Sequence, residues 1–177
     1  MSSATTPAIP GASAPHTPLT REWRRIRALW GARRVGVFAT VGPDGSPQLT
    51  PIGSLYLDEL EPRGYYHPIF TSRLRRNLGE SGRFELLFLD LSLWTWTRAL
   101  LRGRFDRLVA ARLRGSALGA RRAATSEELA RWQRLVRPVR WTRGYELLWK
   151  DARYVQELSF DSCVPVRFGA MSHATEG

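Results

Sequence analysis

Apolar residues recur at the three- and four-residue spacing of a helix in two stretches of the chain. Residues 20–33 carry them at Trp23, Ile26, Leu29 and Trp30. The second stretch opens at Thr125 or Ser126 and carries them at Leu129, Trp132, Leu135 and Val136. This period predicts an amphipathic helix in each stretch, with one apolar face against a core. Further helices are expected over 73–81, with Ser72 as the cap, over 92–101 and, after the break at Pro138, over 141–155.

Compact apolar runs bounded by turn residues predict strands between these helices. The turn VGPDGSP separates the runs 35–40 and 48–57, which are expected to pair as a hairpin. Further strands are expected over 64–71, 83–90 and 112–123, with one or two strands over 155–169. The order from 35 to 90 is therefore strand, turn, strand, turn, strand, helix, strand, in a mainly β chain.

The length of 177 residues and a hydrophobic content of 43% fit one globular domain, expected over 19–171. Residues 1–18 are rich in Pro, Ala, Ser and Thr and lack the charged and apolar regions of a secretory signal, so a disordered tail is expected there. A short C-terminal tail is expected over 172–177. No run of residues is long and uncharged enough to span a membrane, and no membrane association is expected.

Twenty-seven basic and sixteen acidic residues give a net charge of +11, which raises the question of nucleic acid. Every basic residue except Lys150 is arginine. This preference runs through the whole chain, so it indicates a general bias in amino-acid composition and does not point to one binding face. Five arginines recur every third residue from Arg131 to Arg143. On a helix they would sweep about 240°, so they share no face. Nucleic acid is therefore not the expected partner.

Cys163 is the only cysteine, so no intramolecular disulfide can form, which favours a reducing, cytoplasmic compartment. His67 is the only histidine outside the expected tails, and no carboxylate stands at ligand spacing from it, so no metal site is predicted.

The segment from Val35 to Asp90 resembles a known family. Its order of elements, the turn VGPDGSP, the strands QLTPIGSLYL and YYHPIFTSR, and SRLRRNL leading into RFELLFLD are similar to the pyridoxamine 5′-phosphate oxidase-like FMN-binding split-barrel superfamily. In that family a six-stranded split barrel dimerises, and FMN lies in the groove between subunits. The resemblance implies a β-barrel with added helices, a homodimer and FMN as the cofactor.

The resemblance also implies which residues bind the cofactor. A flavin phosphate needs hydroxyls, the N–H groups of a helix start and guanidinium groups. The matching phosphate ligands in this chain are Thr71, Ser72, Arg73 and Arg76. The strand beside the isoalloxazine ring, which acts chiefly through its backbone, matches Thr50, Pro51 and Ile52. A solvated helix face is the alternative explanation for the two arginines.

Two departures limit the expected activity. Leu74 stands where many members carry lysine after the arginine, and Thr50 and Leu55 replace basic residues of the second strand. The resemblance therefore implies a flavin-dependent oxidoreductase with a small-molecule substrate, and not pyridoxamine phosphate oxidation itself. Its alternatives are a deazaflavin F420-dependent reductase, a non-catalytic flavin-binding protein and, with least support, a nucleic-acid-binding protein. The C-terminal aromatics, expected chiefly in core or dimer packing, can also cover a partner's flavin: Trp132, Trp141, Tyr145 and Trp149.

Overall fold

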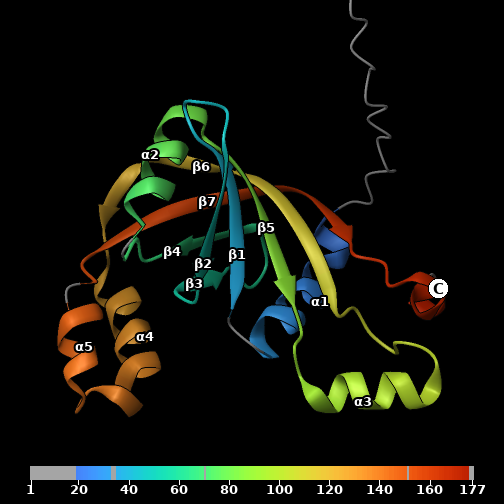
Figure 1. Cartoon of the computed structure of the whole chain (residues 1–177). Coiled ribbons are helices and arrows are strands. Elements are labelled where there is room, and N and C mark those ends of the chain that lie inside the picture. Colours follow the sequence, from blue (N-terminus) through green and yellow to red (C-terminus); the bar gives the residue numbers. More distant parts are fainter. Residues whose placement is uncertain (1–18, 33–34, 70, 151, 176–177) are drawn as a thin grey trace, which may run out of the picture.

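The computed structural model describes residues 19–32, 35–69, 71–150 and 152–175 (Figure 1). The expected tail over 1–18 and the last two residues of the chain lie outside this part. The helices are α1 (Leu19–Ala32), α2 (Ser72–Ser81), α3 (Leu93–Arg102), α4 (Ser126–Val136) and α5 (Arg143–Leu148), with short 3₁₀ helices η1 (Arg137–Val139) and η2 (Gly169–Thr175). The strands are β1 (Gly36–Val41), β2 (Pro47–Ile52), β3 (Leu55–Leu57), β4 (Arg63–Tyr66), β5 (Arg83–Leu89), β6 (Ala110–Ala123) and β7 (Tyr154–Pro165).

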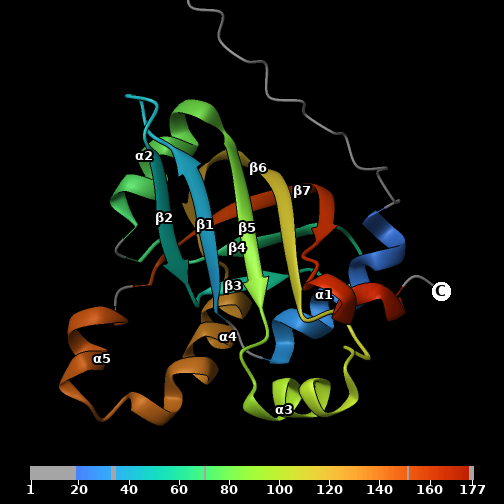
Figure 2. The same cartoon turned by 45° about the vertical axis from the view of Figure 1, so that its right-hand side comes forward.

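Within the described residues these strands form one antiparallel sheet in the order β2-β1-β5-β6-β7-β4-β3. The two edge strands, β2 and β3, are consecutive in sequence and separated only by Gly53 and Ser54. Since each residue spans at most about 3.6 Å, the facing ends of the two edges lie within about 11 Å of each other. The sheet must therefore curl until its edges approach, and Figures 1 and 2 show this curled, half-closed barrel.

The inside of the curled sheet holds the main core, and α1 closes its open side. The apolar face predicted for α1 is buried, with Trp23 and Ile26 at 1% and 0% exposure. Trp23 and Trp30 donate their indole N–H groups to the backbone oxygens of Asp58 and Leu55, at 3.0 and 3.2 Å. These bonds fix α1 against the edge strand β3 and its turn while the rings fill the core.

Two outlying helical units flank the barrel (Figure 2). The pair α4 and α5 forms a second apolar cluster around Trp132, Val136 and Tyr145, which packs on Tyr56 and Ile69 of the barrel. The helix α3 packs through Ala99 and Trp96 on a third cluster near the C-terminus: Phe105, Val109, Phe168 and Met171. No helix in the described ranges is long and apolar enough to span a bilayer.

Most predicted elements are confirmed, and three boundaries are wrong. The strand predicted over 48–57 is broken into β2 and β3, because Ser54 donates its hydroxyl to the backbone oxygen of His67 where the chain crosses between the sheet edges. The strand predicted over 64–71 ends at Tyr66, before Pro68, which has no N–H to donate to a ladder.

The helix predicted over 141–155 is the third wrong boundary, since it stops at Leu148. The residues from Tyr154 onward pair with β4 and β6 instead. Pairing on both sides satisfies the backbone of this segment within the sheet, which outweighs its local helical pattern.

Candidate functional site

The helix α2 begins with an N-terminus that no side chain caps. Thr71, and not the expected Ser72, is the N-cap residue, and its side chain makes no cap hydrogen bond. The Thr71 hydroxyl is buried and has no hydrogen-bond partner in the described part of the chain. The first turn contains no acidic residue. Because the first N–H groups of a helix lack intrahelical partners and carry partial positive charge, this end favours an anion.

Exposed positive charge surrounds the start of α2. Ser72, Arg73 and Arg76 are exposed, and neither arginine has an ion-pair partner among the residues that the structure describes. Arg76 faces the β1–β2 turn, where hydrogen bonds from Ser46 lower the pKa of Asp44 and the charge of Arg76 lowers it further. The guanidinium groups of α2 are therefore available to an anionic ligand.

Asn77 fastens α2 to the β1–β2 hairpin. Its side-chain amide donates to Thr40 Oγ1 at 2.9 Å and to Gln48 Oε1 at 3.1 Å. Gln48 lies on the same face of β2 as Thr50 and Ile52, because side chains alternate along a strand. Of the three predicted residues of this strand, Thr50 and Ile52 thus share the face toward α2, whereas Pro51 is exposed on the opposite face.

Phe38 connects the two predicted parts of the site. It lies opposite Thr50 in the β1–β2 register, and its ring centroid is 5.4 Å from that of Tyr66. Burial raises the pKa of Tyr66 to about 12, so the phenol keeps its proton at neutral pH. The hydroxyls of Tyr66 and Thr71 interact weakly, but neither makes a hydrogen bond of normal geometry. Two buried hydroxyl groups therefore remain unsatisfied beside the start of α2.

A cavity of about 270 Å³ opens next to this helix start. Its walls come from the β4–α2 connection, the end of β6, the helix α5 and the α5–β7 connection. Three side chains in the lining are cationic, Arg121, Lys150 and Arg153, and one is acidic, Glu146. The remaining lining residues are apolar or aromatic: Pro68, Ile69, Leu147, Leu148, Ala152 and Tyr154.

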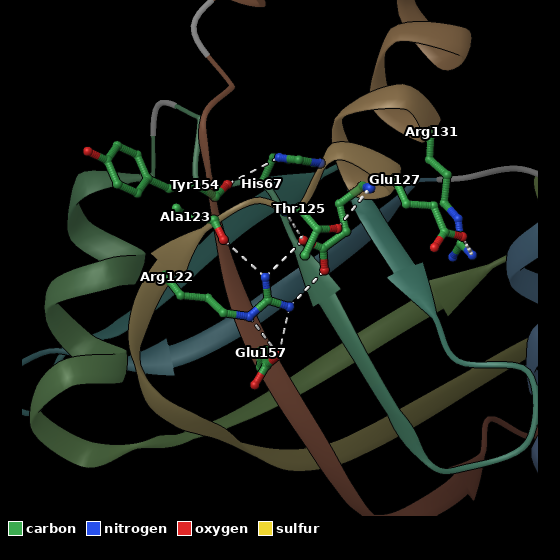
Figure 3. A network of polar contacts seen from close by, with 9 residues as sticks. His67, Arg122, Ala123, Thr125, Glu127, Arg131, Tyr154 and Glu157 are labelled. Carbon is green, nitrogen blue, oxygen red and sulfur yellow. Dashed lines mark hydrogen bonds and ion pairs between the residues drawn. The ribbon is translucent and has the colours of Figure 1, made fainter.

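A clamp centred on Arg122 fixes the strand ends behind this cavity (Figure 3). Its guanidinium donates to both carboxylate oxygens of Glu128, at 2.9 and 2.7 Å, and to Glu157 at 2.9 Å. Glu128 also closes a capping box with Thr125 at the start of α4. These bonds lower the pKa of Glu128, with the hydrogen bond from Arg122 as the largest cause. The clamp joins β6, α4 and β7.

His67 fixes the opposite wall. Its Nδ1 lies 3.1 Å from the backbone oxygen of Tyr154, a bond that Figure 3 shows bridging the end of β4 and the start of β7. The ring is fully buried near Tyr65 and Trp132. Burial is the main cause that lowers the pKa of His67, so the ring is neutral at pH 7 and donates through Nδ1–H.

The described residues hold no group of three His, Cys, Asp or Glu that could hold a metal ion. Burial raises the pKa of Cys163 to about 12, so its thiol stays protonated and is no nucleophile at neutral pH. The described residues therefore supply neither a metal centre nor a reactive thiol.

The cavity was not predicted from the sequence, in which Arg121 is one of many arginines and nothing connects it with Tyr154. The chain separates these residues by α4 and α5, so no local pattern joins them; the one signal in the sequence was Lys150, the single lysine among the basic residues.

Comparison with known proteins agrees with the architecture. The family model of pyridoxamine 5′-phosphate oxidase matches residues 23–158. HupZ of Group A Streptococcus is similar over 84% of this chain and 96% of its own, with 17% identity and a TM-score of 0.54. An FMN-binding protein from Syntrophomonas wolfei subsp. wolfei is similar over 84% of this chain and 94% of its own, with 16% identity and a TM-score of 0.53.

An F420 reductase is similar over 78% of this chain and 94% of its own, with 15% identity and a TM-score of 0.53. No curated protein matches the sequence. At such identities the solved structures establish the fold alone, and the expected FMN-binding split-barrel type of fold is confirmed. Together with the family match over most of its length, this fold shows that the chain belongs to the pyridoxamine 5′-phosphate oxidase family.

Proposed function

We propose that this protein binds FMN with its phosphate at the start of α2 and acts as an FMN-dependent oxidoreductase on a small-molecule substrate. The observation that carries the proposal is the uncapped N-terminus of α2, with the unsatisfied hydroxyl of Thr71 and the unpaired exposed Arg73 beside it. A doubly charged phosphate satisfies all of these groups at once. The FMN-binding neighbour from Syntrophomonas wolfei supports the choice of cofactor.

Each residue at the start of α2 has a distinct part in this proposal. Arg73 and Arg76 neutralise the phosphate, and the hydroxyls of Thr71 and Ser72 donate to its oxygens. Leu74 contributes nothing to the phosphate because its side chain is 1% exposed and belongs to the core. The charge that lysine carries there in many members must come from the exposed arginines, chiefly Arg73.

The β2 strand, with Thr50, Pro51 and Ile52, lies beside the ring in the same proposal, acting mainly through its backbone. When bound, the isoalloxazine supplies the redox chemistry. The role of the chain is to hold the ring, neutralise the phosphate and shape a substrate cavity.

The proposal includes a homodimer, with the cofactor in the groove between subunits. The outer face of β1, β2 and β5 carries exposed apolar residues, among them Val41, Leu49 and Leu87. Residues paired across neighbouring strands share one face, so Leu49 opposite Ala39 and Leu87 opposite Val37 form one continuous surface. An apolar sheet face of this kind is typical of a subunit interface.

F420 is the alternative cofactor, and the F420 reductase among the structural neighbours supports this alternative. Its acidic tail would need more cationic surface than FMN, and Arg121 and Lys150 line the cavity beside α2. A protein that holds FMN without turnover is the remaining flavin-based alternative.

The absorption spectrum of the purified protein, before and after denaturation, tests the cofactor. We expect a flavin spectrum and the release of FMN, or, for protein purified without cofactor, a melting temperature that rises on adding FMN. Arg73→Ala should weaken FMN binding by about tenfold or more, because a charge-assisted contact with the phosphate is lost.

Arg24→Ala is the matched control. Arg24 is exposed on α1, on the other side of the barrel from α2 in both Figure 1 and Figure 2. Equal FMN affinity in the two variants would place the phosphate elsewhere. A colourless protein that is stabilised by neither FMN nor F420 would refute a flavin function, and stabilisation by F420 alone would select the alternative cofactor.

A further inference from the structure

Four exposed arginines stand without a carboxylate partner where the chain passes from α4 to α5. In the part of the chain that the structure describes, none of them forms an ion pair: Arg134, Arg137, Arg140 and Arg143. The preceding segment differs, because every arginine from Arg98 to Arg131 except Arg121 pairs with an aspartate or a glutamate. Positive charge is therefore balanced locally over 98–131 and left unbalanced over 134–143.

The structure gathers these arginines at one turn of the chain, residues 134–143, which we call the α4–α5 corner. α4 ends at Val136, η1 continues directly from it, and Thr142 is extended (φ −91°, ψ 147°) before α5 begins. The sweep of about 240° that would separate these positions requires one continuous helix, which the chain does not form here. Residues three apart eclipse one another in a 3₁₀ helix, so Arg137 and Arg140 lie on one side of η1. Figures 1 and 2 both show this corner at the outer margin of the molecule, away from the barrel.

Trp141 lies in the middle of the α4–α5 corner and is 86% exposed. Its indole N–H donates to the backbone oxygen of Pro138 at 3.0 Å, so the one polar atom of the ring is already used inside the corner. The hydroxyl of Thr142 donates to the backbone oxygen of Val139 at 2.7 Å and tightens the same turn. The ring is thus held in place and presents an aromatic face to the surroundings. A fixed aromatic face is a platform for stacking that loses little entropy on binding.

An aromatic platform among unpaired arginines favours one kind of anionic partner. Guanidinium groups form strong, often bidentate bonds with phosphates, and nucleic acid bases stack on aromatic side chains. Bases inside a double strand are already stacked on one another, so an unpaired strand fits the ring better. A lipid surface fits less well, because a helix that lies on a membrane inserts a whole apolar face. Over 134–145, all of which the structure describes, Trp141 is the one exposed large apolar side chain.

We propose that the α4–α5 corner binds single-stranded nucleic acid, with its four unpaired arginines on the phosphates and Trp141 stacked on a base. Contacts of these two kinds read no base edge, so the binding should depend little on sequence. The corner shares no residue with the start of α2, and the proposal does not rest on the proposed flavin function.

Fluorescence anisotropy tests this proposal on the purified full-length protein, with its cofactor if it carries one. The probes are a single-stranded RNA of about 12 nucleotides and the DNA of the same sequence, labelled with a dye that emits outside the flavin spectrum. Binding of either probe supports the proposal. Its association constant should fall as salt rises from about 50 to 200 mM, with a slope of about −3 in log K against log salt, because each of the arginines contributes about −0.7.

Two variants separate the charge from the ring. Arg137→Ala removes one phosphate contact, so it should weaken binding and make the salt slope shallower by about 0.7. Trp141→Ala removes the stacking ring and should weaken binding by about tenfold with the slope unchanged. Arg24→Ala is the matched loss of one exposed charge, on α1, and should bind both probes within about twofold of the unaltered protein.

Equal binding by Trp141→Ala and the unaltered protein would overturn the proposal, as would an unchanged salt slope in Arg137→Ala. Binding to phosphatidylserine vesicles without binding to either probe would also overturn it and assign the corner to a membrane surface. The cofactor site is measured separately, since Arg137→Ala should keep its FMN affinity within about threefold. A protein that binds a probe through the corner but never FMN would refute the proposed function alone, and FMN binding without binding of either probe would refute this proposal alone.

Discussion

At the scale of single residues, burial decides which groups are charged and which are available. His67 is neutral because its ring is enclosed by aromatic side chains, and Glu128 is ionised because Arg122 bonds both of its oxygens. The hydroxyl of Thr71 is equally buried but has no partner in the described residues. An unsatisfied buried donor is costly, so a ligand that accepts a hydrogen bond from Thr71 would stabilise the start of α2.

The neutral state of His67 predicts a pH dependence of stability. The pKa of His67 in the folded chain is below its ordinary value of 6.5. Between these two pKa values the unfolded chain therefore binds a proton at His67 and the folded chain does not. The free energy of unfolding should therefore fall as the pH drops below about 6.5, until the lowered folded pKa is reached. Urea denaturation at pH 7.5, 6.5 and 5.5 measures this.

His67→Gln provides the comparison for that measurement. The variant should be less stable at pH 7.5 and should lose less stability between pH 7.5 and 5.5, since its side chain does not titrate. The other two histidines are present in both proteins, so their contributions cancel. The same loss of stability in both proteins would show that His67 does not govern this range.

The Arg122 clamp predicts a contrast between two arginines of one region. Arg122→Ala leaves Glu128, whose side chain is only 12% exposed, without its guanidinium partner. We expect a loss of about 1–3 kcal/mol in unfolding free energy. Arg131→Ala removes an exposed pair with Glu127 and should cost less than about 1 kcal/mol. Chemical denaturation at pH 7 compares them, and equal losses would contradict a structural role for the clamp.

At the scale of elements, the close pairing of β6 with β7 shapes the barrel. The register between these strands shifts at Arg114/Gly115, where an irregularity bends the long strand. A Cβ at Gly115 would lie 2.1 Å from the backbone oxygen of Ser159 and 2.8 Å from the ring of Phe84. Only glycine allows this approach, so the curvature of the sheet depends on that residue.

Two glycine variants should therefore behave in opposite ways. Gly115→Ala forces the strands apart and should lower the melting temperature by several degrees or prevent folding. Gly79→Ala, in α2, meets no atom within 4 Å and should raise the free energy of unfolding by about 0.5–1 kcal/mol. Thermal denaturation followed by circular dichroism tests both, and a neutral Gly115→Ala would show that β6 and β7 can separate without cost.

At the scale of the whole molecule, apolar surface is left uncovered on the outside of the barrel. Leu49 on β2 is 72% exposed, and α3 presents Leu93, Trp94 and Leu101 at 75% exposure or more. The helix α3 lies at the outer margin of the molecule in both views. A single copy of the chain does not bury these side chains, which supports the proposed homodimer.

The homodimer predicts a change of mass on substitution at the sheet face. Leu49→Asp places a charge opposite Ala39 on that face and should shift the protein from dimer to monomer in size-exclusion chromatography with light scattering. Leu60→Asp is the matched control, because Leu60 is 82% exposed in the turn between β3 and β4, away from this face. A monomeric unaltered protein, or dissociation by Leu60→Asp alone, would contradict the proposed interface.

The residues predicted from the sequence for the cofactor site remain predictions, although the fold brings most of them near one another. Thr71, Arg73 and Arg76 belong to one helix start, as expected, and Thr50 shares the face of β2 toward that helix. Pro51 lies on the opposite face, so only its backbone could serve the proposed ring site. Local pattern could supply the helix start because capping and charge are properties of consecutive residues.

Local sequence patterns predict the elements whose burial repeats regularly: the apolar face of α1, the helices α2 and α4, and the hairpin of β1 and β2. These depend on neighbours a few residues apart, and periodicity records them. Contacts between residues far apart in the chain set where 48–57 breaks, where the helix after Pro138 stops, and how the cavity with Arg121 and Lys150 in its lining forms. His67 and Tyr154 are 87 positions apart and meet because β4 pairs with β7, a long-range pairing that no local pattern encodes.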